Sequence, residues 1–211
     1  MYDVDGSVLI EIGYDLVRLP ETSKAFSEIN EELYDDFEDF KDSIHEDEFA
    51  EYKDIAKSYK SSSGAGEWQP YLDTYAAEIT TLADGYLSVK YTTDWYMGGV
   101  HNQNHYGLTF DLNTGDEIDL DDIQQALPQG SNLLSFIHSM VYNYMETEGL
   151  MDRMFDNAVE NTELDDYHFY LNNKEIVICT DTYLLADGAA GSFEIPLGIY
   201  IDNLSNTQLN A

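Results

Sequence analysis

The chain has 211 residues, with 42 Asp and Glu against 9 Lys and Arg, and a formal net charge of -33. Because nucleic acids and anionic membranes attract Lys and Arg, this charge excludes a nucleic-acid partner and disfavours an anionic membrane surface. Hydrophobic residues make up 43% of the chain and aromatic residues 13%, which predicts a folded protein. The negative charge is compatible with cationic proteins, neutral glycans or divalent cations as partners, or it serves only to keep the surface solvated.

The first 66 residues are expected to form a strand followed by a long amphipathic helical region. Alternating apolar residues predict a strand over 7–17, which Leu19-Pro20 ends. From Glu21 to Ile44 the apolar residues recur every three or four positions, and a longer step after Ile44 predicts a kink or a second helix near residues 45–47. A Ser- and Gly-rich stretch then separates residues 1–66 from residues 67–211, two regions that we expect to pack together.

Residues 67–211 are expected to form an antiparallel meander, then helices, then a C-terminal hairpin. Turn-forming triplets at 83–85 and 113–115 separate alternating segments, as in β-hairpins. The expected strands are 67–82, 86–97, 104–112, 117–120, 167–171, 175–183 and 193–201, and the expected helices are 121–126, one capped by Ser131 and a further one over 150–158. Without a visible β-α-β alternation, the fold class is α+β, with mainly antiparallel sheets packed with helices.

Cysteine content and hydropathy limit the other possibilities. A lone Cys179 excludes an intramolecular disulfide and a cysteine-rich zinc site, and we expect it to be an inert, buried thiol within a strand. No stretch approaches the ~18 apolar residues of a membrane span, so we expect no membrane insertion by this chain. Polar residues follow Met1 directly, so the chain is expected to be either cytosolic or trimmed of an export segment.

The segment from Trp95 to His105 is the most distinctive in the sequence. His101 and His105 are four residues apart, a spacing that binds zinc on a helix, but the paired Gly98-Gly99 predicts a loop and no metalloprotease Glu accompanies them. The alternative is a glycine turn in which His101 satisfies backbone groups. We therefore predict no metal site and no cofactor.

Nothing in the sequence supports catalysis. The chain lacks a Gly-x-Ser-x-Gly elbow and a phosphate-binding glycine loop, and pairs of carboxylates carry no information among 42 acids. We therefore predict that the protein is not an enzyme and assign no catalytic residue.

Aromatic residues gather around the glycine pair and suggest a recognition surface. Tyr side chains provide amphipathic contact area at low entropic cost, and Trp95, Tyr96, Gly98, Gly99 and His101 are the binding candidates in this segment. Because alternate residues of a strand point to opposite faces, at least half of the neighbouring aromatic residues are expected to serve the core instead; these neighbours are Tyr86, Tyr91 and Tyr106.

Two separated motifs resemble a known bacterial family. The first comprises Gly98-Gly99-Val100-His101, then residues 106–115 and 118–123; the second covers residues 183–197, with its Ala-Ala-Gly at 189–191 and its Ile-Pro at 195–196. They resemble a domain of unknown function that forms the extracytoplasmic part of the lysozyme-sensing anti-sigma-V factor and also accompanies peptidoglycan deacetylases. The N-terminal strand and the helix containing Ile29-Asn30-Glu31 resemble the companion domain that usually precedes it.

The resemblance implies a non-enzymatic α+β module, extracellular or at the cell surface of a Gram-positive bacterium, with its export segment outside this chain. The best-understood relative binds lysozyme, and regulated proteolysis then frees a sigma factor. Here Asp187-Gly188 replaces the family's common Pro-Tyr, so ligand contacts at Tyr183, Asp187 and Gly188 are expected to differ. The expected partner is a basic protein such as lysozyme, or a cell-wall glycan; the alternatives are an accessory domain of a peptidoglycan-modifying enzyme and a purely structural surface domain.

Overall fold

The computed structural model describes residues 2–3, 5–43, 46–62, 68–207 and 209. Its first half contains β1 (Ile10–Tyr14), α1 (Lys24–Ser43), α2 (Glu46–Ser62), β2 (Tyr71–Ala83), β3 (Tyr86–Tyr96) and β4 (His101–Asp111). Its second half contains α3 (Leu120–Ala126), α4 (Leu133–Thr147), β5 (His168–Asn172), β6 (Glu175–Thr180) and β7 (Phe193–Tyr200), with short 3-10 turns η1 (Met151–Arg153), η2 (Val159–Asn161), η3 (Leu164–Asp166) and η4 (Ile201–Asn206).

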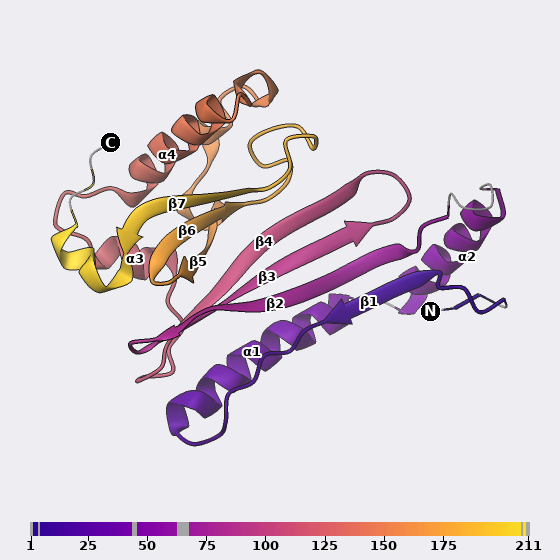
Figure 1. The fold of residues 1–211 in the computed structure, drawn as a ribbon, viewed down its shortest axis with the longest axis horizontal. Helices are drawn as coiled ribbons and strands as arrows, with labels where there is room; N and C mark the ends of the chain where they lie inside the picture. The colour runs from indigo at the N-terminus through magenta and orange to yellow at the C-terminus, as the bar shows by residue number, and fades with distance from the viewer. Residues whose placement is uncertain (1, 4, 44–45, 63–67, 208, 210–211) are drawn as a thin grey trace.

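Two sheets form the centre of the molecule (Figure 1). The first has the order β1-β2-β3-β4 and the second the order β5-β6-β7. All neighbouring strands are antiparallel except β1 and β2. Helices and mostly antiparallel sheets confirm the predicted α+β class.

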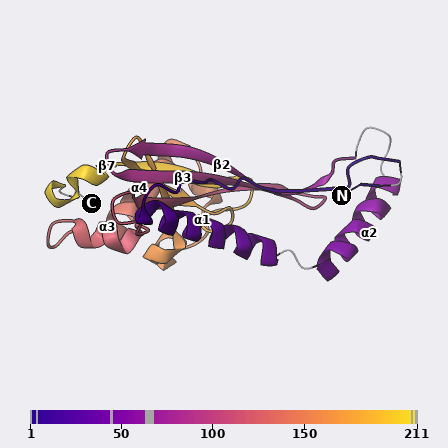
Figure 2. The ribbon, with the colours of Figure 1, turned by 90° about the horizontal axis from the view of Figure 1, so that it is seen from below.

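Alternate side chains of β3 face two different layers of the fold. Leu87, Val89 and Tyr91 are fully buried and pack in one core cluster with Ile29 and Leu33 of α1. The intervening residues of β3 face the second sheet, whose other side packs against α4 through buried Leu133, Ile137, Val141 and Met145. Figure 2 shows α1 and α2 on the same side of the first sheet, so the layer order is helix, sheet, sheet, helix.

Side-chain hydroxyls hold the two sheets together. Ser88 Oγ of β3 accepts a hydrogen bond from Leu171 N of β5 at 2.9 Å and lies 2.9 Å from Thr109 Oγ1 of β4. Thr81 Oγ1 donates to Leu171 O at 2.8 Å. These hydroxyls thus provide hydrogen-bond partners for the N–H and C=O of Leu171 where the two sheets meet.

Ser88→Ala is expected to destabilise the protein by about 2 kcal/mol, because it leaves the buried Leu171 N–H without its acceptor. Urea unfolding followed by circular dichroism measures the change. Ser139→Ala is the matched control, because the Ser139 hydroxyl is exposed and bonds only within α4. Equal stability of the two variants would contradict a role of Ser88 in joining the sheets.

The topology departs from expectation at the N-terminus. β1 pairs in parallel with β2, in a register that runs from Ile10 opposite Tyr71 to Tyr14 opposite Tyr75. The connection through α1 and α2 is therefore a β-α-β crossover, which the sequence analysis did not predict. It was missed because two helices and a long connection separate the paired strands in the sequence.

Four local predictions were wrong, mainly because of helix capping and turn geometry. Residues 117–120 are not a strand: Glu117 forms only a single bridge to Phe110, and Asp119 starts α3 through a capping box with Asp122. Asn132, rather than Ser131, caps α4, since its Oδ1 accepts from Ser135 N at 2.8 Å. The helix expected over 150–158 consists of η1 followed by turns, and β4 begins at His101 instead of residue 104.

Candidate functional site

The first candidate site is a polar hollow between the start of β4 and the loop over residues 181–192. Thr182 N donates to Asn104 Oδ1 at 2.8 Å, and Thr182 Oγ1 donates to Gln103 O at 3.2 Å, so this loop is held against the edge of β4. The hollow has a volume of about 240 Å³ and is lined by His101, Asn102, Gln103, His105, Thr182, Gly188, Gly191 and Ser192.

Polar side chains of β3 hydrogen-bond to the imidazoles and the amide of the polar hollow. His101 Nε2 lies 3.0 Å from Asp94 Oδ1, to which Gln103 Nε2 also donates at 3.3 Å. His105 Nδ1 lies 3.2 Å from Thr92 Oγ1. Burial lowers the pKa of His105, so this imidazole is neutral at pH 7.

Both histidines lie on β4: His105 was expected at the edge of the strand over 104–112, whereas His101 was expected in the loop that the glycine pair predicted. Four residues of strand span ~13 Å, so His101 and His105 cannot share one metal ion. Within the described ranges, no group of three or more His, Cys, Asp or Glu is arranged to hold a metal.

The structure divides the eight predicted binding residues. His101 and Gly188, from separate motifs, line the same polar hollow. Tyr96 lies beside His101, with ring centroids 6.0 Å apart, and Tyr183 packs against Gly188, where an added Cβ would be 2.3 Å from the Tyr183 hydroxyl.

Neither Tyr96 nor Tyr183 is among the residues that line this hollow, and neither are the other four predicted residues. Trp95 pairs with Asn102 across the strands, and because residues alternate it points to the opposite face from Tyr96. Gly98, at φ +81°, packs on Tyr71, whereas Gly99 faces open space. Asp187 forms an ion pair with Arg153 at 3.0 Å.

The neighbouring tyrosines serve mainly the core. Tyr91 is fully buried and stacks on Tyr106, with ring centroids 5.0 Å apart. Tyr106 and Tyr14 both donate hydrogen bonds to the carboxylate of Asp36 on α1. Tyr86 has a different place, in the wall of a second hollow.

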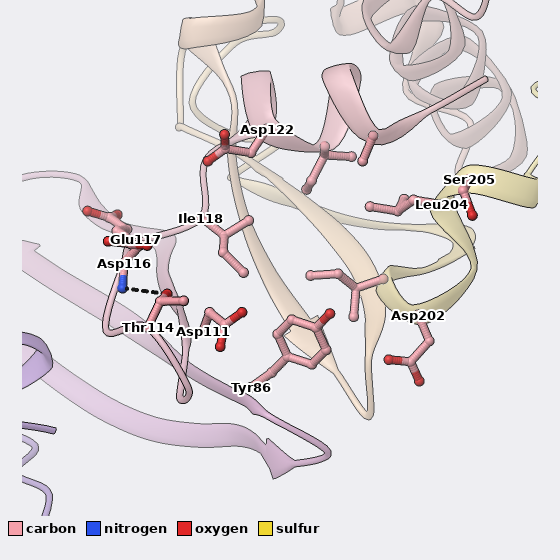
Figure 3. A pocket seen from close by; sticks show the side chains of 13 residues that line it. Tyr86, Asp111, Thr114, Asp116, Glu117, Ile118, Asp122, Asp202, Leu204 and Ser205 are labelled. Carbon is pink, nitrogen blue, oxygen red and sulfur yellow. Dashed lines mark hydrogen bonds between the residues drawn. The ribbon is translucent and has the colours of Figure 1, made fainter. Parts of the chain in front are cut away.

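Sequence reasoning missed this second hollow, which we call the acidic pocket (Figure 3). It has a volume of about 500 Å³ and lies between β3, the loop after β4, α3 and η4. Its apolar residues are Tyr86, Ile118, Ile123, Ala126, Ile201 and Leu204; its carboxylates are Asp111, Asp116, Glu117, Asp122 and Asp202; and Thr114 and Ser205 complete the lining. No Lys or Arg is among these lining residues.

Some of these carboxylates already have partners. Lys174 Nζ lies 2.6 Å from Asp202 and 2.6 Å from Asp84, and Asp111 Oδ1 accepts from Asn113 N at 2.7 Å. Partial burial, followed by the negative charges of nearby acids, raises the pKa of Glu117. A cation entering here would therefore relieve existing repulsion.

The carboxylate lining continues onto α1. A shallower groove of about 190 Å³ shares Glu117 with the acidic pocket and is lined by Glu32, Asp35, Asp36, Asp39, Leu108, Phe110 and Glu117. The acids thus come from α1, the end of β4, the loop after it, α3 and η4. No sequence signal distinguishes them among the 42 acids, because their proximity results from chain folding.

An ionic cluster is enclosed between the two sheets beside the polar hollow. Lys90 of β3 forms an ion pair with Glu194 of β7 and lies over the ring of Tyr170, 5.2 Å from its centroid. Tyr170 donates to Glu194 at 3.0 Å, and His105 Nε2 lies 3.6 Å from the same carboxylate. Burial raises the pKa of Cys179, consistent with an inert thiol.

No family model matches the chain, and no curated protein matches it. Among solved structures, a DUF3298 family member from Bacteroides fragilis matches over 99% of this chain and 88% of its own, with 15% identity and a TM-score of 0.64. The two chains share a fold. A DUF3298 protein from Pseudomonas aeruginosa matches over 73% of this chain and 71% of its own, with 14% identity and a TM-score of 0.46.

The fold therefore resembles that of a domain of unknown function, and this part of the prediction from the two motifs agrees with the comparison. The resemblance to the anti-sigma-V ectodomain stays a prediction. In the part of the chain that the structure describes, no helix has the length and hydrophobicity to cross a membrane.

Proposed function

We propose that the protein is a non-enzymatic, extracytoplasmic binding module that receives a basic segment of a partner protein in the acidic pocket. The observation that carries the proposal is an apolar floor under a rim of carboxylates with no lining Lys or Arg. A Lys or Arg side chain combines an aliphatic stem with a charged end, so it matches both parts of this lining.

Long-range charge supports the same partner class. A net charge of -33 accelerates the approach of a cationic protein, and the attraction weakens as salt screens it. The field acts on all cations, whereas the pocket provides a defined place for one side chain. The charge thus increases the association rate, and the pocket provides the specificity.

Lysozyme and an oligolysine peptide are the probes for this proposal. We expect both to bind at low salt and to bind more weakly as salt increases, measured by isothermal titration calorimetry. The double variant Asp116→Asn/Glu117→Gln should weaken binding about tenfold, since it removes two charges at the rim without changing side-chain volume.

The matched control is Glu146→Gln/Asp152→Asn, which changes the net charge equally at exposed positions outside the acidic pocket. It should alter the dissociation constant less than twofold. Equal weakening by both double variants would show that only the overall field matters and would contradict the pocket. Absence of binding by both probes at low salt would overturn the proposed partner class.

A further inference from the structure

The polar hollow differs from the acidic pocket in charge and in chemistry. The side chains of Gln103, Thr182 and Ser192 bring neutral donors and acceptors to its lining. The nearest acids have partners of their own: Asp94 interacts with His101 and Gln103, and Glu194 with Lys90 and Tyr170. The hollow therefore presents hydrogen-bonding groups without an unbalanced charge in its lining.

Aromatic rings and glycines shape the borders of this hollow. Tyr96 lies beside His101 and also packs on Tyr71 of the core, whereas the half-exposed Tyr183 lies against Gly188. Gly188 has no space for a Cβ beneath the Tyr183 ring, and Gly191 adopts φ +78°. Gly188 thus lets the Tyr183 ring approach its backbone closely, whereas nothing lies within 4 Å of a Cβ at Gly191.

We propose that the polar hollow binds one neutral sugar unit, at a site separate from the acidic pocket and independent of the function proposed above. Sugar hydroxyls both donate and accept hydrogen bonds, as the amide and hydroxyls of the lining do. The C–H face of a sugar ring packs on aromatic side chains, and the half-exposed Tyr183 beside Gly188 provides such a ring. A hollow of about 240 Å³ accommodates one such ring, whose volume is roughly that of six water molecules at ~30 Å³ each.

Other ligand classes fit this hollow less well. The net charge of -33 repels anions, and the acidic pocket offers cations a better site. A purely apolar ligand would desolvate the polar side chains of Gln103, Thr182 and Ser192 and would offer them no hydrogen bond in place of the water that it displaces. A neutral, polyhydroxylated molecule is neither repelled by the net charge nor drawn to the acidic pocket, and it offers hydrogen bonds to the polar side chains of the lining.

A titration of the ¹⁵N-labelled protein with glucose, galactose and N-acetylglucosamine, followed by two-dimensional NMR, tests the proposal. We expect saturable shifts for at least one sugar, confined to residues 101–105 and 182–192. Gln103→Ala/Ser192→Ala should weaken this binding at least fivefold, because two hydrogen-bonding groups are lost. Asp116→Asn/Glu117→Gln should leave it unchanged, which separates this site from the acidic pocket.

The outcomes are distinct. Shifts that remain linear with sugar concentration, or that spread over the whole surface, overturn the proposal. Saturable binding that persists at full strength in Gln103→Ala/Ser192→Ala also overturns it, provided that the remaining resonances show an unchanged fold. Loss of lysozyme binding in the acidic-pocket variant with sugar binding retained would support two independent sites.

Discussion

Gly107→Ala is expected to destabilise the protein by about 3 kcal/mol, the largest effect of a single methyl group that we predict. Gly107 is at the crossing of the sheets, where an added Cβ would lie 2.2 Å from Phe169 O and 2.6 Å from Tyr170 Cβ. These atoms belong to the backbone and the base of a side chain in β5, so a rotamer change cannot relieve the clash. The two sheets must separate, which also strains the hydrogen bonds from Ser88 and Thr81.

Gly99→Ala is the control for this prediction. Nothing lies within 4 Å of a Cβ at Gly99, so its free energy of unfolding should change by less than about 0.5 kcal/mol. Thermal and urea unfolding of the three proteins measure both effects. A Gly107→Ala protein as stable as Gly99→Ala would mean that the sheets do not approach each other as closely as described.

Lys90→Met is expected to cost about 2 kcal/mol at pH 7, because it leaves Glu194 enclosed between the sheets without its cation. The side chains of Lys90 and Glu194 are 15% and 32% exposed, so water screens the pair only in part. Tyr170 still donates to Glu194, but a neutral hydroxyl compensates a carboxylate less well than an ammonium. The double variant Lys90→Met/Glu194→Gln should recover much of the loss, since it removes the uncompensated charge.

The effect of Lys90→Met should depend on pH in a defined direction. Burial alone would raise the pKa of Glu194, but the hydrogen bonds from Lys90 and Tyr170, together with the charge that His105 gains when it is protonated at acidic pH, outweigh it and keep that pKa below its usual 4.5. In the wild type, this stabilisation is present above pH 4.5 and is lost as pH falls through the lowered pKa. Without Lys90, burial raises the pKa of Glu194, so protonation of this carboxylate at acidic pH removes the uncompensated charge that destabilises the variant.

The difference in stability between wild type and Lys90→Met should therefore be largest near neutral pH and shrink as pH falls through the raised pKa of Glu194 in the variant and then through its lowered pKa in the wild type. Urea unfolding at a series of pH values measures the gap. Lys24→Met is the control, because its pair with Glu28 is largely exposed and its loss should cause no measurable change. A gap that widens on acidification would contradict the assignment of Glu194 as the uncompensated group.

Elements whose signal is local were predictable from the sequence. The apolar spacing in α1 and the alternation and turns of β2, β3 and β4 depend on neighbours a few residues away, so their existence and type followed from the pattern. The errors arose where a cap or a distant strand decided the outcome. Asp119 starts α3 within a segment that alternates like a strand, and the partner of β1 lies beyond two helices.

The candidate sites show the same division. The sequence singled out His101 and Gly188 through separate motifs, but their place around one hollow depends on Thr182 bonding to Asn104 and Gln103 at the edge of β4. Nothing in the pattern distinguished the acids of the acidic pocket, since Asp202 is far along the chain from Asp111 and Glu117.

Composition alone set the net charge of -33 and thereby excluded polyanionic partners, because long-range repulsion depends on the total charge more than on its arrangement. Local periodicity likewise specified the α+β class. Only the tertiary structure decided where the charge becomes a site. The packing of η4 beside α3 and of α1 beside β4 brings carboxylates from distant segments together around the acidic pocket and the groove next to it. Short-range interactions that recognise a ligand depend on this proximity, which the one-dimensional pattern does not contain.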